Sequence, residues 1–259
     1  MHDRLVPFER VLNFRDFGGW ETADGATVRR GKLYRSAAFH DATEADLARL
    51  NTMGLRFLVD LRRPEEREHE PNKWENEACR MIFDDEGARG QALPPHLIAL
   101  MQSDLTPQST YDYMVNLYRE IPFDRRLIGL YRDWFKELTA GGAGVIHCAA
   151  GKDRTGIGCA LTLLALGVDE EAVFADYEFT NAAVDLERRM PRIQARMEER
   201  LGRKLDPEAL RPMLGVHTDY LRAALDAIGT QHSSADAYIT DVLGIDAAAR
   251  QLLRERLTA

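Results

Sequence analysis

A cysteine and an arginine separated by five residues form a pair that could act on a phosphate ester. Cys148 and Arg154 have this spacing, between a short apolar run that ends at His147 and an apolar segment at 157–166. A loop that leads into a helix N-terminus directs backbone N–H groups toward one point, where they can bind an anion. The positive electrostatic field of these N–H groups also favours the thiolate, which is the nucleophilic form of cysteine. The spacing therefore predicts a nucleophile at the base of an anion-binding loop.

The residues after Cys148 are the expected ligands of the phosphate. They are Ala149, Ala150, Gly151, Lys152, Asp153, Arg154 and Thr155. Arg154 offers a planar fork of donors that matches two phosphoryl oxygens. Thr155 is expected to cap the helix and to donate to the sulfur. His147 is expected to fix the loop and the ionisation of the cysteine. Lys152 either suits a substrate with additional phosphates or is exposed and balances Asp153.

A phosphatase also needs a proton donor, because an alkoxide or phenolate leaves poorly without a proton. Asp60 ends a strand-like apolar run at 55–61, and ligands of α/β sheets bind beyond the carboxyl ends of strands. We therefore expect Asp60 to be the general acid. The alternative acid is Asp153, inside the loop. A purely structural Asp60 would cap a turn or pair with Arg62 or Arg63.

Two strings of the sequence resemble one family. The string His-Cys-Ala-Ala-Gly-Lys-Asp-Arg-Thr-Gly at 147–156 is similar to the phosphate loop of the bacterial tyrosine phosphatase B type of cysteine-dependent phosphatase. Asn-Phe-Arg-Asp-Phe-Gly-Gly at 13–19, with Gly-Lys-Leu-Tyr-Arg-Ser at 31–36, is similar to that family's opening. The resemblance implies a protein tyrosine phosphatase-like fold and hydrolysis through a phosphocysteine. It implies phosphotyrosine proteins as substrates, with phosphoserine, phosphothreonine or phosphoinositides as further candidates, and Asp60 matches the family's proposed acid.

Two other functions use a similar loop. A phosphate-binding module would capture phosphorylated partners without turnover, but retention of both Cys148 and Arg154 speaks against it. Sulfur transfer or arsenate reduction would not explain the Lys-Asp-Arg-Thr string. A metal site would need more Cys or His near His147, so we expect no metal and no cofactor.

Composition limits the partners and the compartment. The 259 residues carry a formal net charge of −8, which argues against nucleic-acid binding and against a basic membrane-binding surface. The three cysteines do not suggest a disulfide framework, and we expect Cys79 and Cys159 to be buried. No signal-like or membrane-spanning run is evident. We therefore expect a cytoplasmic protein without integral membrane association, although export without a signal is left open.

No linker rich in Pro, Gly or Ser divides the chain, so we expect one domain over 1–259. The resemblance implies that this domain is of the α/β class, with a mostly parallel central sheet flanked by helices. The expected elements are a hairpin at 13–36 that turns at 23–26, strands at 55–61 and 80–83, and helices at 43–53, 109–119, 124–138, 169–177, 218–228, 235–243 and 246–257. Residues 87–107 show no pattern and are expected to form a mobile loop beside the site.

Apolar residues recur at helical spacing in 186–201. That segment is either an amphipathic helix on the core or part of a lid over about 181–215. Arg15, Asp16 and Arg35 either form structural ion pairs or line the pocket edge.

Overall fold

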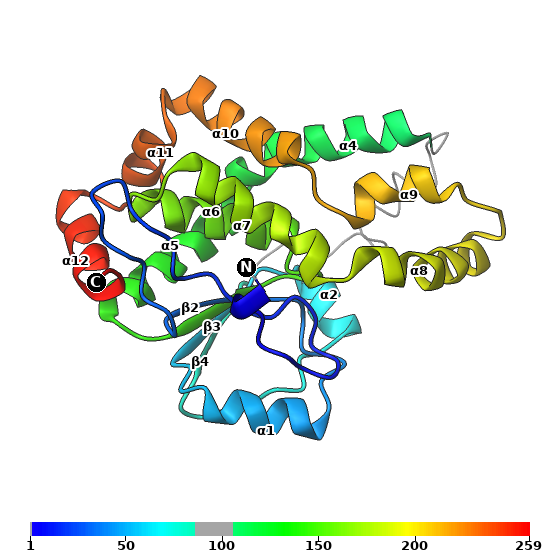
Figure 1. The fold of residues 1–259 in the computed structure, drawn as a ribbon, viewed down its shortest axis with the longest axis horizontal. Helices are drawn as coiled ribbons and strands as arrows, with labels where there is room; N and C mark the ends of the chain where they lie inside the picture. The colour runs from blue at the N-terminus through cyan, green and yellow to red at the C-terminus, as the bar shows by residue number, and fades with distance from the viewer. Residues whose placement is uncertain (1, 86–105) are drawn as a thin grey trace.

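The computed structural model describes residues 2–85 and 106–259. They form a five-stranded sheet with helices around it (Figure 1). The strand order is β1-β2-β5-β3-β4, and only β1 runs antiparallel to its neighbour among the described pairs. The strands are β1 Arg15–Asp16, β2 Leu33–Ser36, β3 Phe57–Asp60, β4 Arg80–Ile82 and β5 Gly144–His147. This arrangement confirms the predicted α/β class with a mostly parallel sheet.

The order of the strands decides where the candidate nucleophile lies. β5 is the central strand, with β2 and β3 parallel on either side, and all four of its residues are buried. Asp60 pairs with His147 across β3 and β5, so both strands end at the same edge. Cys148 therefore leaves the sheet at the middle of the edge where ligands of parallel sheets bind.

Helices cover the two faces of the sheet unequally. Figure 1 shows α1 alone on one side and most of the other helices on the opposite side. A small apolar cluster under α1 includes Leu50, Leu58 and Val145, whereas a much larger cluster on the other face includes Trp134 and Ile146. In chain order, the helices up to α7 are α1 Glu44–Thr52, α2 Pro64–His69, α4 Pro107–Glu120, α5 Arg125–Ala140, α6 Asp153–Ala165 and α7 Glu170–Ala183, with short turns η1 His2–Arg4 and η2 Ile121–Phe123.

Local signals placed several helix ends correctly. Thr43 caps α1 through a hydrogen bond from the Asp46 N–H, and Asp124 caps α5. α5 ends at Gly141, which has a φ of 97°. α5 buries an apolar stripe at helical spacing, made of Leu127, Leu130, Tyr131, Trp134, Phe135 and Leu138, whereas Ile128 is only partly covered. The predicted hairpin is also confirmed, since β1 and β2 pair in antiparallel register.

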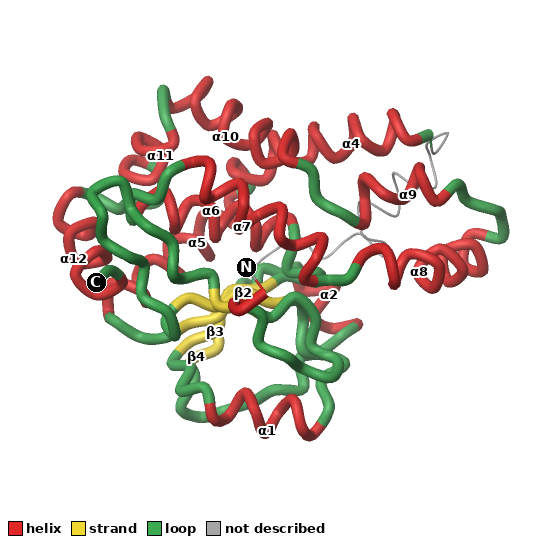
Figure 2. The backbone as a smooth tube through the Cα atoms, in the orientation of Figure 1, coloured by secondary structure: helices red, strands yellow, loops and turns green. Residues whose placement is uncertain are grey.

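The C-terminal part is helical, as predicted. Its elements are α8 Leu186–Leu201, α9 Pro207–Leu214, α10 Thr218–His232, α11 Ala235–Asp241 and α12 Ala247–Leu257. α8 and α9 lie together at one end of the molecule (Figure 2) and share a separate apolar cluster that includes Met190 and Leu210. Pro207 begins α9, whereas Pro191 lies inside α8 without ending it.

Two remaining expectations concern the loop at 87–107 and membrane-spanning helices. The loop predicted at 87–107 falls outside the described residues, except that Thr106 caps α4 and Pro107 begins it. Among the described helices, none is long and apolar enough to cross a membrane.

Candidate active site

The candidate nucleophile lies at the start of a tight loop between β5 and α6. Cys148 is 2% exposed, whereas the next two residues, Ala149 and Ala150, are exposed. The loop bends at Gly151, whose φ is +64°, and a Cβ there would lie 2.2 Å from the Ser36 carbonyl oxygen. Glycine is therefore required at this position by conformation and by space. The buried Cys148 thus occupies the base of the loop, and the exposed Ala149 and Ala150 form its rim.

Arg154 lies in the first turn of α6 and is held by a carboxylate from α2. Its Nη1 and Nη2 donate to the two oxygens of Glu66 at 2.6 and 2.8 Å, and Nη1 also donates to the Leu61 carbonyl at 3.2 Å. Burial alone would lower the pKa of Arg154, but Glu66, with a smaller contribution from Cys148, raises it overall. Burial opposes ionisation of Glu66 as well, yet Arg154 brings its pKa down to about 2. The guanidinium is therefore always charged and fixed in orientation.

Asp60 ends β3 as expected, but its carboxylate is already occupied. Arg62 donates to it from Nε, from Nη2 at 2.7 Å and from the backbone N–H, and Asn72 donates at 3.3 Å. Asp60 is 2% exposed. Burial would raise its pKa, but His147 and Arg62 lower it overall. An ionised and covered carboxylate is poorly suited to deliver a proton to a substrate, so these contacts favour the alternative acid.

That alternative, Asp153, is the first residue of α6 and keeps 23% of its side chain exposed. Tyr118 donates to its Oδ1 at 2.7 Å, and Tyr177 donates to the Tyr118 hydroxyl at 2.6 Å. Burial raises the pKa of both tyrosines well above the ordinary value, so both remain neutral donors. Sequence reasoning missed both tyrosines, because they carry no local signal beyond the apolar spacing of their helices.

His147 is fully buried and joins the loop to the polar cluster around Asp60. Its Nδ1 lies 3.1 Å from the Cys148 carbonyl oxygen, and its Nε2 lies 3.2 Å from the Asn72 Nδ2. Burial lowers the pKa of His147, which Asp60 only partly offsets, so the ring is neutral at pH 7. Because a carbonyl only accepts and an amide nitrogen only donates, the ring proton lies on Nδ1.

Two loop residues differ from their expected surroundings. Lys152 is 5% exposed, so the interpretation of an exposed lysine is wrong. Its Nζ donates to the Met213 carbonyl in α9 and lies 3.4 Å from an Asp153 oxygen. Thr155 does not cap α6, which begins two residues earlier, and its buried hydroxyl has no hydrogen-bond partner among the described residues.

The N-terminal polar residues form buried ion pairs, which was one of the two expected roles. Arg15 and Arg35 are 0% exposed and both pair with Asp176 of α7. Asp16 instead accepts from the Gly18 and Gly31 N–H groups. The other two cysteines are buried free thiols, as predicted, and burial raises the pKa of Cys79 to about 11 and that of Cys159 to about 12.

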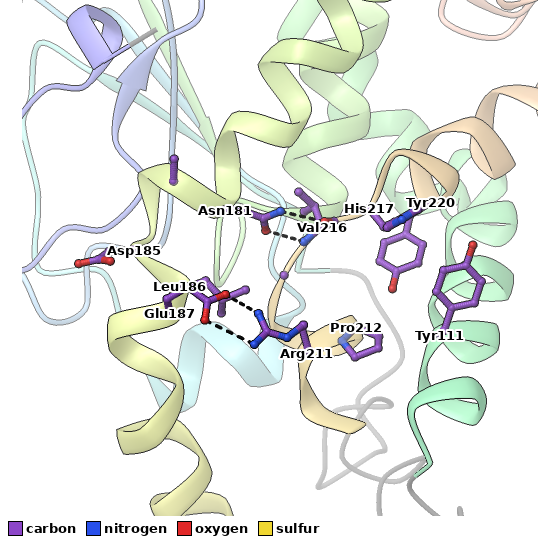
Figure 3. Close-up of a pocket in the computed structure, with 12 residues that line it drawn as sticks. Tyr111, Asn181, Asp185, Leu186, Glu187, Arg211, Pro212, Val216, His217 and Tyr220 are labelled. Atoms are coloured by element: carbon purple, nitrogen blue, oxygen red, sulfur yellow. Dashed lines mark hydrogen bonds and ion pairs between the residues drawn. The ribbon is translucent and has the colours of Figure 1, made fainter. Parts of the chain in front are cut away.

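A cavity of about 470 Å³ lies between the C-terminal helices and α4 (Figure 3). Figure 3 shows the Arg211–Glu187 ion pair on one side and the Tyr111 and Tyr220 rings on the other. The Tyr220 ring, which lines the cavity, lies 5.5 Å from the ring of Tyr118, whose hydroxyl donates to Asp153. Within residues 2–85 and 106–259, no three His, Cys, Asp or Glu side chains are grouped as metal ligands would be.

Comparisons with known proteins agree with this arrangement. A family model described as the tyrosine phosphatase family matches residues 6–259. A provisionally named tyrosine-protein phosphatase of Cupriavidus necator is 32% identical over 95% of this chain and 86% of its own length. The triple specificity protein phosphatase PtpB of Mycobacterium tuberculosis is 30% identical over 93% of this chain and 95% of its own. The chain therefore belongs to the tyrosine phosphatase family.

Proposed function

We propose that this protein is a phosphoric monoester hydrolase that acts through a phosphocysteine intermediate. The observation that carries the proposal is a buried thiol and a fixed guanidinium on one short loop at the N-terminus of α6. The Cys148 thiolate attacks phosphorus and forms the S–P bond as the P–O bond to the leaving group breaks. Arg154 and the loop N–H groups bind the equatorial oxygens. Positioning and charge stabilisation dominate this kind of transfer.

A carboxylic acid then protonates the leaving oxygen, and we propose Asp153 for this role in preference to Asp60. Asp153 is partly exposed on the loop itself, whereas Arg62 and Asn72 engage the covered carboxylate of Asp60. In the second step the resulting carboxylate takes a proton from water, which attacks the phosphocysteine. The S–P bond breaks, and inorganic phosphate leaves as the thiolate is regenerated.

Phosphotyrosine proteins are the proposed substrates, with phosphoserine, phosphothreonine and phosphoinositides as further candidates. The relative from Mycobacterium tuberculosis is named a triple specificity phosphatase, which supports a range wider than phosphotyrosine. Lys152 is the loop cation available to an additional phosphate, but it would first have to leave the Met213 carbonyl.

We also propose that the chain is a single phosphatase domain in which about 181–215 act as a lid. α8 and α9 share their own small apolar cluster, so they can move as a unit. Lys152 joins that unit to the phosphate loop through Met213. A lid of this kind excludes water from the reaction once substrate is bound.

The decisive experiment is a panel of phosphotyrosyl, phosphoseryl and phosphoinositide substrates with wild type and three variants. Cys148→Ser should show no turnover but should still bind substrate. Asp153→Asn should lose about 10²-fold in kcat, chiefly with poor leaving groups that need a proton. Asp60→Asn should lose thermal stability but keep the wild-type dependence on the leaving group. The acid assignment is reversed if Asp60→Asn, and not Asp153→Asn, loses the poor leaving groups.

Two alternatives have distinct outcomes in the same assays. If wild type binds phosphopeptide but does not hydrolyse a small aryl phosphate, the protein is a phosphate-binding module. Thiosulfate consumption without phosphatase activity would indicate sulfur transfer, and arsenate consumption would indicate arsenate reduction.

A further inference from the structure

The four carbonyls from Cys148 to Gly151 each accept a hydrogen bond from a group outside the phosphate loop. The acceptors and donors are Cys148 O with His147 Nδ1 at 3.1 Å, Ala149 O with Ala38 N at 3.0 Å, Ala150 O with Asn13 Nδ2 at 3.1 Å, and Gly151 O with Asn13 Nδ2 at 2.8 Å and Arg35 Nη2 at 3.0 Å. In a trans peptide the C=O and the following N–H point in opposite directions. Carbonyls held outward therefore leave the N–H groups from Ala149 to Lys152 directed into the loop, where an anion binds.

Two of these donors are side chains from the N-terminal hairpin. Asn13 has a φ of 58° and is 3% exposed, and its Oδ1 accepts from an Arg15 Nη1. Because the oxygen faces Arg15, the Nδ2 faces the loop, so the amide has one orientation. Arg35 is fully buried in β2 and reaches Gly151 from beneath. Neither side chain is on the loop or on α6.

The charges around these donors are not balanced. Arg35 donates to one Asp176 oxygen at 2.7 Å, and the Arg15 Nε lies 3.6 Å from the other. Burial, together with the neighbouring charge of Arg35, lowers the pKa of Arg15 to about 9, so both guanidinium groups are charged at pH 7. Two cations therefore share one carboxylate directly behind the loop. Buried charge is costly, and apolar residues of similar volume would stabilise a core at least as well. The arrangement is better explained by the anion site in front of it.

We propose that Asn13 and Arg35 are positioning residues of the phosphate loop. They hold the Ala150 and Gly151 carbonyls outward before substrate arrives, so that the adjoining N–H groups are already aimed at the phosphoryl oxygens. Arg15 and Asp176 act one step further back, by orienting Asn13 and Arg35. The inference rests on the proposed function, and it assigns a role to the hairpin that closes on the loop. Donors aligned in advance need no reorganisation in the transition state.

The test compares Asn13→Gly and Arg35→Lys with wild type. Glycine accepts the positive φ at position 13, and lysine keeps a positive charge for Asp176. Both variants should lose about 10- to 100-fold in kcat with 4-nitrophenyl phosphate, since a small misplacement of catalytic donors has effects of that size. The affinity for inorganic vanadate, which the same N–H groups bind, should fall by a similar factor, while KM changes less than threefold.

The matched control is Thr162→Val on α6. The Thr162 hydroxyl accepts from Trp134 and donates to the Gly158 carbonyl, so its removal also loses buried hydrogen bonds, but none of them reaches a loop carbonyl. This variant should melt earlier yet retain wild-type kcat and vanadate affinity. If it loses as much vanadate affinity as the other two, their effect is general destabilisation and the inference is wrong. The inference is also wrong if Asn13→Gly and Arg35→Lys bind vanadate within twofold of wild type.

Failure of the proposed function would look different. If wild type shows no phosphatase turnover, the proposed hydrolase activity is wrong. Binding of inorganic phosphate, measured by calorimetry, would still report the geometry of the loop. Weaker phosphate binding by Asn13→Gly or Arg35→Lys would then support the positioning role on its own. Should Asn13→Gly not fold, Arg35→Lys carries the comparison.

Discussion

Glu66 and Arg154, which are 88 residues apart in the chain, form a two-point ion pair with distances of 2.6 and 2.8 Å. The pair links α2, which follows β3, to the first turn of α6, which follows the phosphate loop. A planar guanidinium held at two points cannot turn freely, so its remaining edge keeps one direction. The orientation of the candidate phosphate-binding arginine therefore depends on α2, which follows a different strand from the one that leads into the loop.

Replacing Glu66 should change the pH dependence of stability. The folded pKa of Glu66 is about 2, against an ordinary value of 4.5, so its carboxylate stabilises the fold fully above pH 4.5 and loses this effect as the pH falls toward 2. Glu66→Gln should lower the free energy of unfolding at pH 7 by about 2 to 3 kcal/mol, as measured by urea unfolding. The difference from wild type should shrink between pH 5 and pH 3. An equally large difference at pH 3 would contradict the ion pair, and Glu68→Gln on the exposed side of α2 is the control.

Removing the Tyr118 hydroxyl should lower kcat only for substrates whose leaving group needs a proton. Tyr118→Phe takes away the hydrogen bond that orients Asp153, which is worth about 1 kcal/mol and therefore about fivefold in rate. We expect kcat to fall about fivefold with phenyl phosphate but by less than twofold with 4-nitrophenyl phosphate, whose leaving group needs no proton. Tyr238→Phe removes a buried hydroxyl that donates to the Pro122 carbonyl instead, and it should affect neither substrate. Equal losses with both substrates would argue against Asp153 as the acid.

A methyl group at Gly151 should disrupt the loop. The φ of +64° and the 2.2 Å approach to the Ser36 carbonyl leave no room for a Cβ, so Gly151→Ala should cost more than about 3 kcal/mol. Gly25→Ala is the matched control, because Gly25 has a φ of +86° in open space. It should cost about 1 to 2 kcal/mol, from conformation alone. Urea unfolding of both variants checks the difference, and similar values would mean that the close approach to Ser36 does not limit the loop.

Lys152 should govern how firmly α9 is held against the loop. Lys152→Met removes the bond from Nζ to the Met213 carbonyl, so amide exchange in 207–214 should become about fivefold faster, as expected for about 1 kcal/mol. Lys136→Met, at an exposed position of α5, should leave that exchange unchanged. Mass spectrometry of deuterated peptides measures both. Unchanged exchange in Lys152→Met would remove the main support for a link between loop and lid.

Local patterns in the sequence were sufficient for most of the elements and for the loop itself, but they gave no sign of α2 and ended α7 at 177 instead of Ala183. Cys148 and Arg154 lie within one strand-loop-helix segment, so their proximity follows from spacing alone. The α5 stripe and the caps at Thr43 and Asp124 are equally local, since each depends on residues within a few turns. The mostly parallel arrangement of the sheet was expected from the family resemblance of the strings at 13–36 and 147–156.

The partners of the site residues were decided only by the tertiary structure. The sequence placed Asp60 at the end of a strand and offered Arg62 as one possible partner, but it did not decide that this pair would form or that Asn72 would also donate to the carboxylate. Nor did it bring Tyr118 to Asp153. The contacts of Asn72 and Tyr118 join separate segments of the chain, and their effect on ionisation depends on how much water the packing excludes. Spacing along a chain fixes which residues share a turn or a strand end, whereas burial and long-range contact exist only after the sheet and helices have closed together.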